Sequence, residues 1–175
     1  MRRPKTWSGR PSPRREAAGH DPGGARVFVS KAGSLLRGSR VADLIADLLR
    51  SAKTIAFVGM SGNPEKDAHT VPKFMLEQGY RVVPVNPTAT EILGLKVYKA
   101  ITEVPEQVDI VDVFRPGPEC DKVAEAAVKI RPRAVWLQLG ITNARAKEIV
   151  ESSGIQFIED KCLRIEYKRV FDWAK

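Results

Sequence analysis

Residues 54–64 read Thr-Ile-Ala-Phe-Val-Gly-Met-Ser-Gly-Asn-Pro, an apolar run that ends in a glycine-rich segment. An apolar pattern typical of a helix follows within about ten residues. A buried strand, a tight turn and then a helix bring several backbone N–H groups and the positive end of a helix dipole to one point. The segment therefore predicts a strand at 54–58 and, after it, a turn suited to an anion such as a phosphate.

The apolar pattern around this segment alternates between strands and helices. Helices are expected at 40–51, 70–78, 119–130 and 143–153, and strands at 54–58, 81–85, 109–114, 134–137 and 155–158. A shorter strand or turn is expected at 163–167. Since parallel neighbours need crossover connections, this order predicts an α/β fold: a Rossmann-like, doubly wound parallel sheet in three α/β/α layers. Its ligand is expected beyond the carboxyl ends of the strands, where the loops 59–70, 86–88, 114–118 and 138–143 converge.

The positive charge of the chain is confined to one end. The formal net charge is +8, and residues 1–40 hold ten Lys or Arg and two Asp or Glu, so the remainder is neutral. A neutral domain argues against nucleic-acid binding, except through the N-terminal segment. We expect residues 1–38 to be a disordered basic tail and 39–175 to be the folded domain. The tail fits a solvated extension or over-long start, an arm for nucleic acid or acidic surfaces, or an organelle transit peptide.

The composition indicates a protein of the cytoplasm. The chain has no apolar run long enough to span a membrane, and we expect no membrane association. Its two cysteines, Cys120 and Cys162, are too few and too far apart for a disulfide framework or a zinc site. We expect Cys162 to be a buried structural residue, whereas the position of Cys120 at a helix start could lower its pKa.

The first turn departs from the common nucleotide motifs. The nicotinamide-dinucleotide fingerprint G-x-G-x-x-G has a serine, Ser61, at its middle glycine, and the second strand ends in Asn86-Pro87 without an acid. The phosphate-binding pattern G-x-x-x-x-G-K-[ST] does not occur either. An NAD(P)-binding redox enzyme or sensor therefore stays the alternative. Within the turn, Ser61 and Gly62 are the phosphate candidates, Lys66 could reach a phosphate, and Thr70 is the expected N-cap of the next helix.

Other residues that could take part in chemistry have simpler interpretations. His69 is expected to be a solvated loop residue, and Trp136 a core residue. Asp109 and Asp112, three apart on one strand, face opposite sides and do not form a carboxylate pair. Because no Ser/His/Asp set or metal cluster emerges, a catalytic role is not expected.

Five segments in order resemble the stand-alone CoA-binding proteins, and they are similar to the N-terminal CoA-binding domain of the succinyl-CoA synthetase α subunit. They are 55–61, 79–87, 108–115, 135–140 and 160–162. The resemblance covers residues 40–170 and implies a Rossmann-like fold with coenzyme A as the ligand. The chain departs from the family at Thr88, where a basic residue is frequent, and at His69-Thr70, where a serine and a tyrosine are usual.

The resemblance also implies roles for individual residues. Gly59, Ser61 and Asn63 would contact the pyrophosphate and phosphopantetheine, while Asn86 and Pro87 would border the adenosine. A wall of the nucleotide pocket would come from Val113, Phe114, Arg115 and Pro116, and Gln138 and Gly140 would lie near the pantetheine arm.

The synthetases of this group carry their phosphorylated histidine in a second domain, for which these residues hold no counterpart. We therefore expect a non-catalytic module that binds CoA or an acyl-CoA, as a carrier or a metabolite sensor.

Overall fold

A computed structural model describes the backbone of residues 33–172 and the side chains of residues 40–172. The first helix, α1 (Gly33–Ser51), begins seven residues before the helix expected at 40–51. Residues 33–38, assigned to the tail in the sequence analysis, therefore belong to α1. The rest of the expected tail, residues 1–32, lies outside the described residues.

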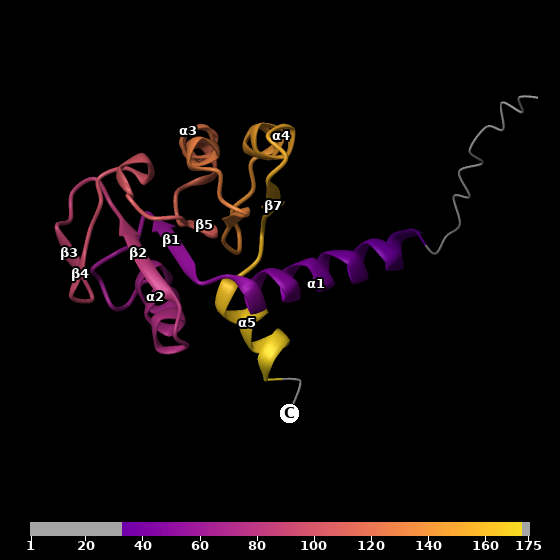
Figure 1. Ribbon diagram of the computed structural model, residues 1–175, viewed down its shortest axis with the longest axis horizontal. Coiled ribbons are helices and arrows are strands. Elements are labelled where there is room, and N and C mark those ends of the chain that lie inside the picture. The colour runs from indigo at the N-terminus through magenta and orange to yellow at the C-terminus, as the bar shows by residue number, and fades with distance from the viewer. Residues whose placement is uncertain (1–32, 173–175) are drawn as a thin grey trace, which may run out of the picture.

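The centre of the domain is a five-stranded parallel sheet in the order β2-β1-β5-β6-β7 (Figure 1). Its strands are β1 (Thr54–Val58), β2 (Arg81–Val85), β5 (Ile110–Val113), β6 (Ala134–Leu137) and β7 (Gln156–Ile158). A small antiparallel pair, β3 (Glu91–Ile92) and β4 (Leu95–Lys96), lies beside β2 at the edge. The structure confirms the Rossmann-like α/β fold.

Helices cover both faces of the sheet. In Figure 1, α3 (Cys120–Ala127) and α4 (Ala144–Ser152) lie on one face, and α1, α2 (Asp67–Glu77) and α5 (Leu163–Phe171) lie on the other. The described residues also contain three short 3-10 helices: η1 (Ile101–Glu103), η2 (Gly117–Glu119) and η3 (Val128–Ile130). None of the described helices is both long and apolar enough to cross a bilayer.

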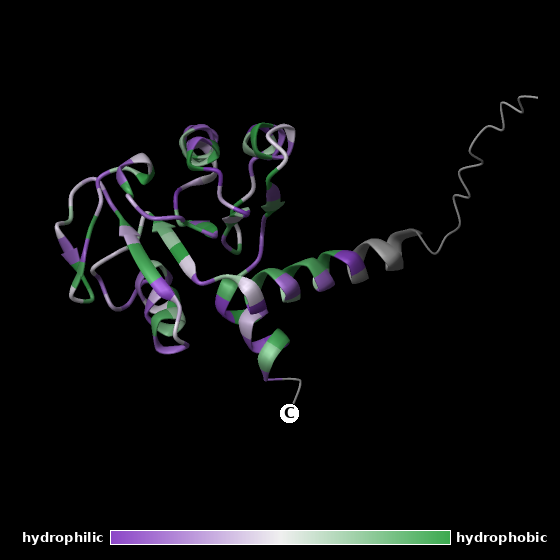
Figure 2. Cartoon of the chain, viewed as in Figure 1, coloured by the Kyte–Doolittle hydropathy of each residue, from purple (hydrophilic) through white to green (hydrophobic). Residues whose placement is uncertain are grey.

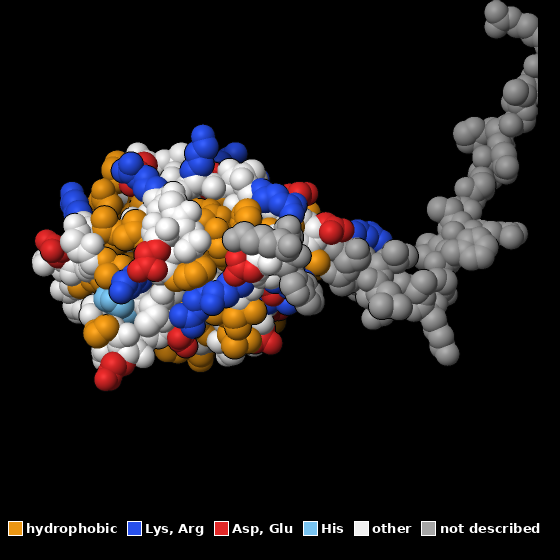
Figure 3. Space-filling view, turned by 90° about the horizontal axis from the view of Figure 1, so that it is seen from below, with side chains coloured by type: hydrophobic (Ala, Val, Ile, Leu, Met, Phe, Trp, Pro, Cys, Tyr) orange, Lys and Arg blue, Asp and Glu red, His pale blue; other side chains and the backbone are white. Residues whose placement is uncertain are grey.

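Alternation along the strands builds two apolar layers. On β1, Ile55 and Phe57 face the layer that contains α1, α2 and α5, whereas Ala56 faces the layer with α3 and α4. Figure 2 shows β1 and β2 coloured mostly as hydrophobic, as expected for strands covered on both faces. The surface over α1, α2 and α5 is mixed: in Figure 3, Lys and Arg side chains lie beside Asp and Glu side chains.

The strand or turn expected at 163–167 is wrong, because this segment is helix α5. Its buried residues Leu163, Glu166 and Val170 recur every three or four positions, which is the helical period. The segment 163–167 has five residues, which is too short to distinguish the helical period from the alternation of a strand. The ring of Tyr167 packs against the rings of Phe74 on α2 and Phe171, with centroids 5.5 Å and 4.4 Å apart. Helix α5 thereby completes the layer that contains α1 and α2.

Candidate functional site

The connections that follow β1, β2, β5 and β6 meet at the carboxyl edge of the sheet. Gly59, directly after β1, has a φ of +87°, and a Cβ there would lie 3.0 Å from Arg115 Cδ and 3.1 Å from the Phe114 carbonyl oxygen. Only glycine meets both conditions without strain. Gly59 therefore allows the chain after β5 to pass directly over the end of β1.

The segment 59–66, which we call the first loop, satisfies many of its own hydrogen bonds. The amide of Ser61 donates to the Ala68 carbonyl (3.0 Å), and Ser61 Oγ accepts from the Asn63 amide (3.1 Å). Asn63 Oδ1 accepts from the Glu65 amide (2.9 Å). Among the described residues, no hydrogen bond is made by the amide of Gly62, which is exposed, whereas Met60 is completely buried. The Gly62 amide thus remains as a backbone donor for a ligand.

Helix α2 starts earlier than expected. Its N-cap residue is Lys66, whose exposed side chain makes no cap bond, and Thr70 lies inside the helix. The prediction of Thr70 as the N-cap is therefore wrong, because the turn that closes at Lys66 already starts the helix. Thr70 Oγ1 instead accepts from Arg164 of α5 (3.3 Å), and Arg164 also lies 3.7 Å from Asp67 Oδ1.

The histidine beside this loop is not simply solvated. His69 is half-buried, and its Nδ1 lies 2.8 Å from the Ser61 carbonyl oxygen. This contact ties the start of α2 to the first loop, so His69 has a structural partner.

Asn86 connects the ends of β1 and β2. Its Nδ2 donates to the Met60 carbonyl (2.9 Å), while its Oδ1 accepts from the Thr88 amide and hydroxyl (2.8 and 2.9 Å) and from the Ala89 amide (3.1 Å). The Asn86 side chain therefore links the loop after β1 to the loop after β2. Thr88 stands at the position where a basic residue is frequent in the family that the sequence resembles, and its amide and hydroxyl complete this turn.

A cavity of about 230 Å³ opens between the ends of β1 and β2 and the start of α3; we call it the groove. Its lining is mainly apolar, with Val58, Val85, Ala100, Ile101, Val123 and Ala126, together with Gly59 and Pro87. Three cationic side chains also line it: Lys99, Arg115 and Lys122. An apolar hollow with basic groups at its lining suits a ligand that combines a flat ring with an anionic group.

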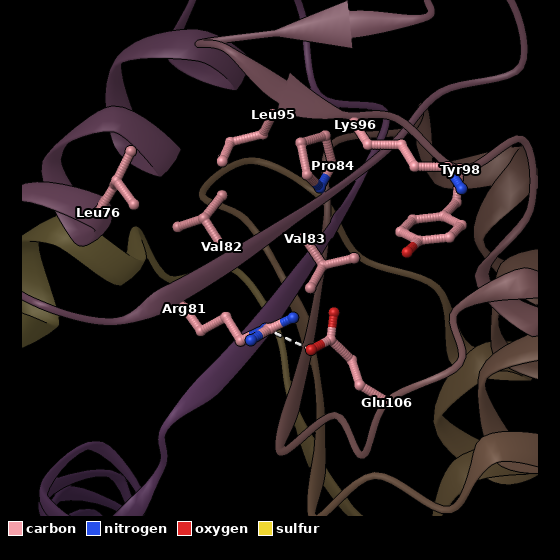
Figure 4. A pocket seen from close by; sticks show the side chains of 9 residues that line it. All are labelled: Leu76, Arg81, Val82, Val83, Pro84, Leu95, Lys96, Tyr98 and Glu106. Carbon is pink, nitrogen blue, oxygen red and sulfur yellow. Dashed lines mark ion pairs between the residues drawn. The ribbon is translucent and has the colours of Figure 1, made fainter.

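A second hollow lies along the outer edge of the sheet, away from this site. It has a volume of about 300 Å³ and is lined by Val82, Pro84, Leu95 and Tyr98, with an ion pair between Arg81 and Glu106 (Figure 4). Arg81 begins β2, so this hollow extends toward the amino end of the strand and away from the first loop. It is not part of the carboxyl-edge site.

The segment after β5 divides between the core and the groove. Val113 is completely buried and packs in the layer with α3, so it does not reach the groove. Phe114 is half-buried against Phe57, with ring centroids 6.4 Å apart, and Pro116 is exposed. Arg115 lines the groove while its Nε donates to Glu119 Oε2 (2.9 Å). Of these four predicted residues, Arg115 is the one that lines the groove.

The end of β6 is occupied by a buried polar pair. Gln138 donates from Nε2 to both carboxyl oxygens of Asp112 (2.9 and 2.7 Å), and Asp112 is fully buried. Burial raises the pKa of Asp112 well above its usual range, and the hydrogen bonds from Gln138 and the Val113 backbone only partly oppose this shift. Gly140, at φ +80°, donates its amide to Asp160 Oδ1 (2.8 Å).

The two cysteines and the tryptophan have clear environments. Burial, together with repulsion from Glu119 and Asp121, raises the pKa of Cys120 to about 11, contrary to the lowered value considered from its helix position. Cys162 is half-buried, not fully buried as expected. Trp136 is completely buried, which confirms its core position, and its Nε1 donates to the Lys161 carbonyl (2.7 Å).

This architecture defines a Rossmann-like α/β domain, a class of fold in which ligands bind beyond the carboxyl ends of the strands. The chain belongs to the CoA binding domain family, whose model matches residues 53–168. The family membership expected from the five segments is thereby confirmed.

Relatives are of two kinds, small proteins and parts of larger ones. The chain is 35% identical to "Uncharacterized protein YneT" of Bacillus subtilis over 70% of this chain and 91% of that protein. It is 37% identical to "Acetate--CoA ligase [ADP-forming] II subunit alpha" of Pyrococcus furiosus, over 68% of this chain but 28% of the subunit. A solved structure from Thermus thermophilus, cell-free ID.343, matches with a TM-score of 0.72 and 38% identity, covering 74% of this chain and 98% of that one.

Sequence reasoning missed three cationic residues around the site: Lys99, Lys122 and Arg164. Lys99 lies in the stretch between β4 and η1, where the apolar pattern carries no period. Lys122 and Arg164 are exposed or half-exposed helix residues, and a lysine or arginine on a helix usually indicates a solvated face. Counting the charged residues that follow or begin elements at the carboxyl edge would have marked Lys122 and Arg164 as candidates.

Proposed function

We propose that this chain binds coenzyme A or an acyl-CoA at the carboxyl edge of its sheet, as a non-catalytic module that serves as a carrier or metabolite sensor. The observation that carries the proposal is the groove: an apolar hollow with Lys99, Arg115 and Lys122 on its lining, beside a loop whose exposed Gly62 amide is available for an anion. Coenzyme A combines a flat adenine, a diphosphate and a flexible arm, and the site offers a matching element for each.

The adenine would occupy the groove, between the Pro87 side and the Val123 side. The diphosphate would lie against the amide of Gly62 and near the start of α2, where the helix dipole favours negative charge. Gly62 is exposed, and a Cβ there would meet open space, so the ligand can approach this amide closely. The pantetheine arm would then pass over the ends of β5 and β6 toward Gly140.

The surroundings support binding rather than chemistry. His69 is held by the Ser61 carbonyl, and the thiol of Cys120 is buried with a raised pKa. Asp112 is enclosed with Gln138 under the sheet end. Within the described residues, no nucleophile and base lie within hydrogen-bond distance of each other at the groove.

Titration calorimetry with CoA, 3′-dephospho-CoA and NAD tests this proposal. We expect heat of binding with the CoA forms and weaker or no binding with NAD. The variant Ala126→Leu, which fills the groove, should weaken CoA binding at least about tenfold. Ala144→Leu, an exposed position on α4, is the matched control and should bind like the wild type. No heat with either CoA form, together with clear NAD binding, would replace the proposal with the dinucleotide alternative.

A further inference from the structure

Lys99 is fixed beside the end of β2 by backbone hydrogen bonds. The amide of Tyr98 donates to the Pro84 carbonyl (3.0 Å), and the amide of Asn86 donates to the Tyr98 carbonyl (2.9 Å). These bonds make Tyr98 a bridge partner of Val85. The next residue, Lys99, therefore enters the groove from the side of Pro87, although it is separated from Pro87 by eleven residues of chain.

The ammonium of Lys99 is also held in place. Its Nζ donates to the Ala89 carbonyl at 2.7 Å. An ammonium has three N–H donors, so two remain for a ligand. The Lys99 side chain is already ordered before a ligand binds. Binding therefore costs less side-chain entropy than it would at a lysine that moves freely.

Lys122 approaches the groove from the opposite wall. It is the third residue of α3, whose Val123 and Ala126 also line the groove. The carboxylate of the neighbouring Asp121 accepts from the Lys122 backbone amide (2.8 Å).

The acids near the groove leave both ammonium groups without a counter-ion. Glu119 pairs with Arg115, and Glu103 accepts from the Lys99 backbone amide (3.2 Å). Neither Lys99 nor Lys122 forms an ion pair with any residue that the structure describes. The groove thus has two uncompensated positive charges on facing walls, an arrangement that a doubly negative group would neutralise.

We infer that Lys99 and Lys122 bind a phosphate monoester on the ribose of an adenine nucleotide held in the groove. This inference rests on the proposed function and names the specificity of the same site. The 3′-phosphate of CoA and the 2′-phosphate of NADP share this chemistry, and dephospho-CoA and NAD lack it. Thr88, which follows β2, has no charged side chain that could bind this phosphate. Lys99, from a different part of the chain, supplies the positive charge instead.

The experiment compares four ligands, CoA, 3′-dephospho-CoA, NADP and NAD, by titration calorimetry on the full chain. Three proteins are used: the wild type, the double variant Lys99→Gln/Lys122→Gln, and Lys147→Gln as a matched control on the exposed face of α4. We expect the wild type to prefer CoA over dephospho-CoA by about tenfold or more, since charge-assisted hydrogen bonds are strong. The double variant should bind CoA no better than dephospho-CoA, with dephospho-CoA affinity within about twofold of wild type. The control should keep the full preference.

The outcomes separate this inference from the proposed function. Equal wild-type affinity for CoA and dephospho-CoA would overturn the lysine site while leaving CoA binding intact, as would an equal loss of both ligands in the double variant. A preference for NADP over NAD without any binding of CoA would support the lysine site and overturn the proposed function. Absence of binding by all four ligands would overturn both.

Discussion

The two halves of the carboxyl edge are built on different principles. The first loop, residues 59–66, is continuous in sequence and shaped by its own backbone, with the amides of Ser61, Asn63 and Glu65 already paired inside the segment or with α2. The groove is assembled from side chains of β1, β2, η1, α3 and the connections between them. The first loop offers the exposed amide of Gly62, and the groove offers an apolar lining and cations.

This difference shows where ligand specificity resides. A backbone amide binds any anion, so the first loop alone does not separate CoA from a dinucleotide such as NAD. Side-chain shape and charge in the groove can distinguish them, because an ammonium adds affinity only for a ligand with a phosphate at that place. The four predictions that follow test this division, beginning with the residue that joins the two halves.

Gly59→Ala should have the largest effect, because Gly59 is where the first loop and the groove touch. The added methyl would lie 3.0 to 3.2 Å from Arg115 and Phe114 atoms, at a φ of +87°. Strain and overpacking together should lower the free energy of unfolding by about 3 kcal/mol. Urea denaturation measures this change.

Gly62→Ala is the matched control for that experiment. A methyl at Gly62 meets open space, so the free energy of unfolding should change by less than about 0.5 kcal/mol. Equal destabilisation by both variants would contradict the view that the close approach of Arg115 and Phe114 requires glycine at position 59 but not at position 62.

The buried carboxyl beneath the edge should make stability depend on pH. Since burial raises the pKa of Asp112 in the native state, the folded protein binds more protons than the unfolded chain above the ordinary aspartate pKa of about 3.9. Its contribution is therefore most favourable below that pH and declines as pH rises through the raised native pKa. The slope reaches about 1.4 kcal/mol per pH unit.

Asp112→Asn removes this titration while keeping a partner for Gln138. Relative to the wild type, the variant should gain stability as pH increases from 4 toward 8, measured by urea denaturation at each pH. A stability difference that is the same at all these pH values would show that Asp112 is ionised in the native protein.

Alkylation tests how firmly the connection after β5 is held. The thiol of Cys120 lies 3.5 Å from the Arg115 carbonyl oxygen, and its pKa is raised to about 11. At pH 8, about one thiol in a thousand is then thiolate, the reactive form. Iodoacetamide followed by peptide mass spectrometry should modify the half-buried Cys162 at least about ten times faster. Equal rates would indicate that the segment between Phe114 and Glu119 opens readily.

Glu119→Gln should give the smallest effect, on binding alone. The substitution frees Arg115 from its ion pair, which adds positive charge to the groove without changing the first loop. CoA affinity in calorimetry should increase about two- to threefold, and the gain should shrink with added salt. Glu148→Gln breaks a comparable exposed pair with Arg145 on α4 and should leave affinity unchanged; a similar gain there would assign the effect to net charge.

Local pattern predicted most of the sheet but not the ends of its helices. The strands at 54–58, 81–85 and 134–137 agree with the structure to the residue, because each is an apolar run bounded by a turn residue. Thr70 failed as an N-cap since Asp67, Ala68 and His69 already adopt helical geometry. Helix α5 was missed because its buried positions extend past the segment considered.

The sequence by itself determined the strand order along the chain, the family and the glycine turn after β1, since these depend on neighbours within a few residues. Tertiary structure alone decided the groove, the burial of Asp112 with Gln138 and the placement of Lys99 beside Pro87. Those features depend on which distant segments come together: the pairing of Tyr98 with Val85 and the packing of α3 over the sheet leave no periodic trace in the residues themselves.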